Sequence, residues 1–81
     1  MPQIHAWSLE EKELKKELRF TDFREAMIFV NKIATVANEQ DHHPDIGISY
    51  NVVQLTLSTH KIGGLSLNDF ILAAKIDLLA V

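Results

Sequence analysis

The strongest constraint on the fold is an apolar stripe in residues 21–39, TDFREAMIFVNKIATVANE, which stops shortly before a proline. The stripe recurs every three or four residues, as on one face of an amphipathic helix. It consists of Phe23, Ala26, Met27, Val30, Ile33, Ala34 and Ala37. Thr21 is the expected N-cap, and Pro44 restricts His43 to extended geometry, so the helix has to end before it. The pattern predicts a helix that packs on a core.

Two strands are expected after the proline. Residues 45–51, DIGISYN, and residues 52–60, VVQLTLSTH, are short runs rich in β-branched residues. In the second run, apolar and polar residues alternate, so they lie on opposite faces of a strand. The apolar face carries Val53, Leu55 and Leu57, and the polar face carries Gln54, Thr56, Ser58 and His60. The two runs are predicted to pair as an antiparallel hairpin.

The register of that hairpin decides which residues meet at its open end. A two-residue turn at 51–52 places His43 opposite His60, with Cβ atoms about 5 Å apart. A turn one residue earlier, at 50–51, places Asp41 opposite His60 instead. In either register the segments DHHP and STH come together at one end of the sheet.

Three imidazoles, those of His42, His43 and His60, are therefore predicted to gather there, and three interpretations stay open. Imidazoles exchange protons near neutral pH, so they suit general acid–base catalysis. A zinc site is the rival, although adjacent side chains of an extended chain point to opposite faces, and the usual i, i+2 or i, i+4 ligand spacing is missing. In the third interpretation they are polar loop residues, one of which caps the preceding helix.

Residues 8–20, SLEEKELKKELRF, fit two structures. Ser8 and Glu11 match a helix capping box, and local propensity favours a helix. Leu14 and Leu18 are at helical spacing but also share one face of a strand. The residues by themselves leave the choice open.

A second helix, LNDFILAAKIDLLAV, is predicted at 67–81 after the glycine pair at 63–64. Ser66 and Asp69 form a capping-box pattern at its start, which accounts for Asp69 without a functional role. Its expected core face is Leu67, Phe70, Ile71, Ala74 and Leu78, with Leu72, Ile76 and Leu79 mostly off that face. Because a domain of 81 residues rarely buries both faces of a helix, the second set predicts a subunit interface.

Bulk properties narrow the function classes. The length of 81 residues fits one domain, residues 1–81. The chain has no cysteine, which excludes disulfides and cysteine-based zinc sites. The net charge is −3 and there is no basic block, so a nucleic-acid partner is not expected. There is no apolar run of about 20 residues and no signal-peptide core, so a cytoplasmic protein without membrane contact is expected.

The segment DHHPDIGISYNVVQLTLSTHKIGGLSLND, residues 41–69, resembles the signature of the pterin-4a-carbinolamine dehydratases. The matching elements are His42-His43-Pro44, Tyr50-Asn51, Ser58-Thr59-His60, Gly64-Leu65-Ser66 and Asp69. The helix at 21–39 and Trp7 also resemble family segments, so the similarity covers nearly the whole chain. It implies an α+β fold with a four-stranded antiparallel sheet and two helices on one face. The family's additional N-terminal helix would be absent, and residues 8–20 would be a strand hairpin.

The resemblance also implies a reaction, the dehydration of 4a-hydroxytetrahydropterin to quinonoid dihydropterin in tetrahydropterin recycling. It implies a hydro-lyase without metal or organic cofactor, assembled as a homodimer or homotetramer. The implied catalytic residues are His42, His43 and His60, and the implied substrate-binding residues are Asp41, Pro44, Ser58, Thr59 and Trp7. Many members carry a glutamate where this chain has Asn38, followed here by Glu39. Other relatives imply an alternative role as a binding protein, either a transcription-factor dimerisation partner or a carboxylase assembly factor.

Overall fold

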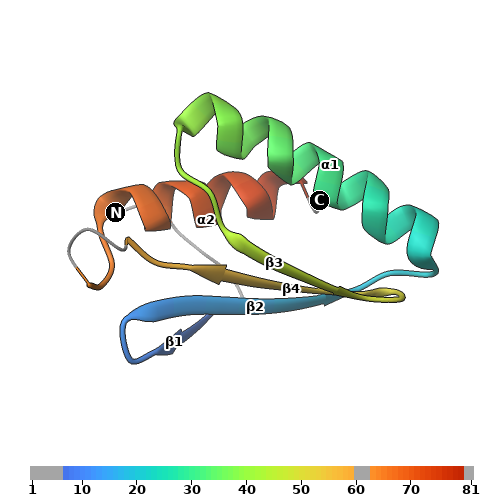
Figure 1. The fold of residues 1–81 in the computed structure, drawn as a ribbon, viewed down its shortest axis with the longest axis horizontal. Helices are drawn as coiled ribbons and strands as arrows, with labels where there is room; N and C mark the ends of the chain where they lie inside the picture. The colour runs from blue at the N-terminus through green and yellow to red at the C-terminus, as the bar shows by residue number, and fades with distance from the viewer. Residues whose placement is uncertain (1–6, 60–62, 80–81) are drawn as a thin grey trace.

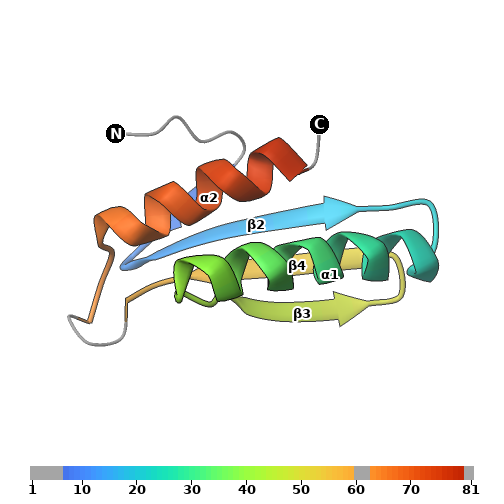
Figure 2. The same ribbon diagram turned by 90° about the horizontal axis from the view of Figure 1, so that it is seen from above.

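The computed structural model describes residues 7–59 and 63–79, and it has an α+β fold in two layers. Two helices cover one face of a four-stranded antiparallel sheet, which confirms the predicted fold class (Figures 1 and 2). In chain order the elements are β1 (Ser8–Glu10), β2 (Glu13–Arg19), α1 (Phe23–Gln40), β3 (Asp45–Ser49), β4 (Val52–Leu57) and α2 (Leu67–Leu79). The strand order is β1-β2-β4-β3. Within the described ranges, no helix combines the length and apolar character needed to cross a membrane.

Residues 8–20 belong to a β-hairpin, so the local helix signal is overridden there. β1 pairs with β2, and β2 pairs with β4 through contacts such as Leu14 opposite Leu57. Both of these leucines are buried beneath the helices. The strand is more stable than a helix here because β4 pairs with the backbone N–H and C=O groups of β2. The alternating pattern of the strand also turns Leu14 toward the core.

The turn between β3 and β4 lies at Tyr50-Asn51. The register predicted for a turn at 51–52 is therefore wrong, and the register predicted for a turn at 50–51 is confirmed. Ile48 lies opposite Val53, as the earlier turn requires. Two hydrogen bonds tie the turn to the end of β2: Phe20 N–H donates to the Asn51 carbonyl at 2.8 Å, and Asn51 Nδ2 donates to the Phe20 carbonyl at 2.9 Å. These bonds hold the chain at Asn51 and thereby place the turn.

The core lies between the sheet and the two helices. The predicted apolar face of β4 is confirmed, since Val53, Leu55 and Leu57 are fully buried. α1 contributes Ala26, Phe29, Ile33 and Ala37. The predicted stripe was partly wrong, because Phe23 and Ala34 are exposed and Phe29 was not among the expected residues. The N-cap is Asp22 and not Thr21, since the Asp22 side chain accepts from Glu25 N–H.

The rotation of α2 differs from the prediction, although Phe70 of the expected core face does pack against the core. Its buried residues are Asp69, Leu72, Ala73 and Ile76. Leu67 and Leu78, which were expected in the core, are 56% and 74% exposed. An all-round apolar helix does not reveal its own rotation, and here the rotation follows from polar contacts: Asp69 bonds to His42 and Thr59, and Asp77 bonds to Lys16 of β2.

α1 ends in a Schellman motif that redirects the chain toward the sheet. Asp41 has the left-handed conformation, with φ of 51°. His42 N–H donates to the Ala37 carbonyl at 3.1 Å, and Asp41 N–H donates to the Asn38 carbonyl at 3.3 Å. Asp41 is exposed, so the motif depends on its backbone. The turn aims His42 away from the helix.

This cap predicts different effects on the free energy of unfolding for two substitutions at the exposed position 41. Asp41→Gly should leave the free energy of unfolding nearly unchanged, because glycine accepts a left-handed conformation. Asp41→Val should lower it by about 1–2 kcal/mol, because a β-branched residue is strained there. Urea unfolding of the two variants checks this, and equal midpoints for Gly and Val would contradict it.

Candidate active site

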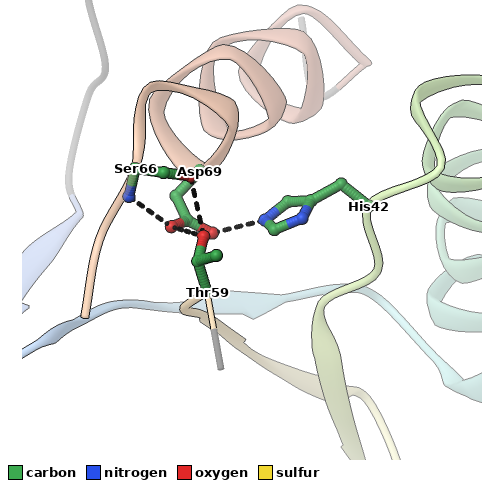
Figure 3. Close-up of polar contacts among 4 residues, drawn as sticks. All are labelled: His42, Thr59, Ser66 and Asp69. Atoms are coloured by element: carbon green, nitrogen blue, oxygen red, sulfur yellow. Dashed lines mark hydrogen bonds and ion pairs between the residues drawn. The ribbon is translucent and has the colours of Figure 1, made fainter. Parts of the chain in front are cut away.

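Three chain segments meet at one end of the sheet. They are the end of α1, the end of β4 and the start of α2, which lie together at the left of Figure 1. His42 follows α1, Thr59 follows β4, and Ser66 and Asp69 open α2 (Figure 3). The prediction that the hairpin brings DHHP beside the end of the second strand is therefore supported through His42 and Thr59, which share Asp69 as a partner.

The centre of this site is a pair formed by His42 and Asp69. His42 Nε2 lies 2.5 Å from Asp69 Oδ1. The side chain of His42 is 15% exposed and that of Asp69 is 0% exposed. A carboxylate without water contact needs hydrogen-bond donors, and a protonated imidazole is a strong one. The pair therefore fixes the orientation of the His42 ring close to the surface.

The second oxygen of Asp69 has two other donors. Oδ2 accepts from the Thr59 hydroxyl at 2.7 Å and from the Ser66 N–H at 2.9 Å. The Ser66 hydroxyl lies 2.7 Å from the Thr59 hydroxyl. Only half of the predicted capping box forms, because the Ser66 hydroxyl bonds to Thr59. Asp69 thus does more than cap α2, since Oδ1 is left for His42.

Asp69 was not among the predicted site residues. An available signal was its position in α2, because an acid among otherwise apolar inward positions needs a buried partner. The capping-box pattern already explained an acid at position 69, so the sequence offered no separate reason to expect a contact between Asp69 and His42. The sequence does not state that Asp69 faces His42, which lies 27 residues earlier.

His43 contacts a different residue from His42. Its Nε2 lies 2.9 Å from Asn38 Oδ1, and both residues are exposed. Asn38 occupies the position at which a family glutamate was expected. Only one member of the His-His pair therefore enters the buried network, while the other contacts the last turn of α1.

The remaining predicted residues near this end differ in their hydrogen-bond partners and in their exposure to solvent. The Thr59 backbone pairs with Gly64 in both directions, at 2.7 and 3.3 Å, so its polar groups already have partners. Ser58 and Thr59 line an open cavity of about 710 Å³. Asp41 is an exposed helix cap, Pro44 is half-buried, and His60 lies outside the described residues.

Trp7 belongs to a second polar cluster. Its Nε1 donates to Asp77 Oδ1 at 2.9 Å, Lys16 Nζ donates to the same oxygen at 2.7 Å, and Lys16 Nζ lies 5.7 Å from the Trp7 ring centroid. Asp77 is eight residues beyond Asp69, about 12 Å along the helix. This cluster gives Trp7 a structural role, and its contact with a substrate stays a prediction.

Metal binding has no three-ligand set in the part of the chain that the structure describes. Among those residues, no group of three His, Cys, Asp or Glu side chains is arranged to hold a metal ion. His42 and His43 contact different partners, Asp69 and Asn38. His42 and His43 therefore share no partner, and His60, the third imidazole of the predicted zinc site, lies outside the described residues.

The fold and the site define a small α+β protein with a histidine–carboxylate pair at the end of its sheet. Residues 1–79 match the family model described as pterin 4 alpha carbinolamine dehydratase. A relative from Nitrosospira multiformis, named "Putative pterin-4-alpha-carbinolamine dehydratase", is 48% identical over 79 residues, covering 98% of this chain and 70% of the relative. A relative of the same name from Chromobacterium violaceum is 49% identical over 73 residues, covering 90% and 68%. The chain belongs to the pterin-4-alpha-carbinolamine dehydratase family.

Solved structures agree with this assignment. A protein from Brucella melitensis, described as a transcriptional coactivator/pterin dehydratase, superimposes with a TM-score of 0.91 at 30% identity, covering 96% of this chain and 85% of that one. A pterin dehydratase-like protein described as a RuBisCO assembly factor in the alpha-carboxysome gives a TM-score of 0.78 at 25% identity, covering 94% and 90%. These two structural neighbours carry descriptions other than pterin dehydratase alone.

Proposed function

We propose that this protein dehydrates 4a-hydroxytetrahydropterin to quinonoid dihydropterin. The C4a–O bond breaks and the hydroxide leaves as water after receiving a proton. N5 loses a proton, and the C4a=N5 double bond forms. Since the reaction needs one acid and one base, it suits imidazole side chains. The buried pair of His42 and Asp69 carries this proposal, together with membership of the family.

The residues take different roles in this proposal. His42 exchanges a proton with the substrate, and Asp69 orients its ring. His60 is the second acid–base group, and His43 is a substrate binder at the more exposed edge of the site. Ser58 and Thr59 line a cavity of about 710 Å³, in the range of small-molecule sites, together with Glu11, Lys12, Glu13, Gly63 and Gly64. Neither His42 nor Asp69 lines this cavity, so among the described residues it adjoins the network only through Thr59.

The direct test is the rate at which freshly prepared carbinolamine forms quinonoid dihydropterin. The uncatalysed rate is measured in parallel without protein and subtracted. We expect the protein to exceed the background in proportion to its concentration. A rate equal to the background would reject the enzymatic function and favour a binding role.

The same chemistry predicts that activity needs no metal ion. Both proton transfers are within the capacity of imidazoles, so exhaustive dialysis against a chelator should leave kcat unchanged. Metal analysis of the active protein checks this. Stoichiometric zinc whose removal abolishes the rate, and whose return restores it, would contradict the prediction.

A homo-oligomer is the proposed assembly, with α2 in its interface. The less buried side of this helix carries Leu67, Ile71, Ala74 and Leu78, spaced four, three and four residues apart, like the seam of a helix pair. Leu72 and Ile76 are core residues, so the interface predicted at those positions moves to this ridge. The same ridge also suits the alternative role, a binding or assembly protein.

Leu78→Glu should weaken this assembly. Leu78 is 74% exposed, so a charge there costs the monomer little but is expensive between two apolar helices. Sedimentation at micromolar concentration should show a smaller species than for the unaltered chain. Ala34→Glu, an exposed apolar position on α1, is the matched control and should keep the original mass. A monomeric unaltered chain would contradict the assembly.

A further inference from the structure

We propose that His42 exchanges protons through Nδ1, because Asp69, positioned by Thr59, keeps the proton of the neutral ring on Nε2. This inference rests on the proposed function for its catalytic meaning. Its physical content is a choice between the two tautomers of the imidazole. Figure 3 shows the four residues that make this choice.

The direction of each hydrogen bond follows from what its donor can do. Ser66 N–H can only donate, so Asp69 Oδ2 accepts from it. The Thr59 hydroxyl has one hydrogen and donates it to the same oxygen. The Ser66 hydroxyl must then be the donor in its 2.7 Å contact with Thr59. A chain of donation therefore runs from Ser66 through Thr59 to Asp69.

The ring of His42 completes this pattern. An ionised carboxylate can only accept, so the proton between Asp69 Oδ1 and His42 belongs to Nε2. In the neutral ring Nδ1 then carries the lone pair. Within the described part of the chain, no hydrogen bond involves Nδ1. This nitrogen can accept a proton as a base and return it as an acid, while Nε2 stays bound to Asp69.

Thr59 acts in this scheme through Asp69 and not on the substrate. Its hydroxyl bridges the end of β4 to the first turn of α2, and its backbone is already paired with Gly64. Loss of the hydroxyl would remove one of two donors from Oδ2 and the acceptor of the Ser66 hydroxyl. The carboxylate could then rotate, and its hold on His42 Nε2 would weaken. Thr59 is thus a positioning residue.

The first experiment is nitrogen NMR on protein with labelled histidines, at a pH where His42 is neutral. Long-range proton–nitrogen correlations distinguish the two tautomers, and a His42→Gln variant assigns the signals. We expect the Nε2–H tautomer to predominate for His42. Predominance of the Nδ1–H tautomer would overturn the inference. This readout needs no catalysis, so a failure of the dehydratase assay leaves it intact.

The second experiment compares Thr59→Val with Thr59→Ser. Valine keeps the shape without the hydroxyl, and a hydrogen bond to a charged group accounts for about 10–100-fold in rate. We expect kcat to fall by that factor with little change in KM, and both His42 tautomers to be populated. Serine should restore the rate and the Nε2–H tautomer. A Val variant with full kcat and an unchanged tautomer, or one that raises only KM, would overturn the role of Thr59.

Discussion

His42→Ala is expected to lower kcat for carbinolamine dehydration by about 10²–10⁴-fold, the usual loss when a general acid or base is removed. The reason is the position of this ring, because it is the only histidine of the described residues that bonds to a buried carboxylate. Alanine removes the proton-exchanging group and leaves Asp69 to its two remaining donors. The measurement is single-turnover formation of quinonoid dihydropterin, corrected for background.

The neighbouring histidine provides a matched comparison. His43→Ala removes the same group one residue away, from an exposed contact with Asn38. It should mainly raise KM, and circular dichroism should show that both variants keep the fold. His60→Ala is expected to match the loss for His42, and the double variant should lose less than the sum if both serve one step. Full activity in both single variants would reject these assignments while leaving the dehydratase function standing.

Asp77→Ala is expected to cause the largest loss of stability, about 3–5 kcal/mol. The Lys16 and Asp77 side chains are each 11% exposed, and their charged atoms are 2.7 Å apart. Truncation removes the carboxylate that lies 2.7 Å from the mostly buried Lys16 cation, and it takes the acceptor from Trp7 Nε1. Such a loss is a large part of the total stability of a small domain, so thermal unfolding should occur at a much lower temperature.

An exposed ion pair on the same strand is the control. Arg19 and Glu17 lie 3.9 Å apart with side chains 74% and 52% exposed. Glu17→Ala should change the free energy of unfolding by less than about 1 kcal/mol, because water screens this pair. Asp77→Asn should be intermediate, since the amide still accepts from Trp7 but does not balance Lys16. Equal losses for Asp77→Ala and Glu17→Ala would show that burial of the pair does not matter.

The sequence by itself determined the features that depend on periodic patterns. The helix that became α1 and the inward face of β4 follow from residue spacing, because burial of one face repeats with the period of the element. The motif from His42 to Asp69 was sufficient to indicate the family, which also corrected the local helix signal in residues 8–20. The meeting of the DHHP segment with the end of β4 followed from antiparallel pairing in either register.

Only the tertiary structure decided the features that depend on contacts between distant residues. The choice of the turn at Tyr50-Asn51 and the rotation of α2 each gain their stability from a partner on another element. The pairing of His42 with Asp69 is the clearest case. The capping box gives Asp69 a local partner, and nothing in the sequence says that its second oxygen faces an imidazole. That contact exists because the Schellman turn at Asp41 and the docking of α2 bring a donor and a buried acceptor together.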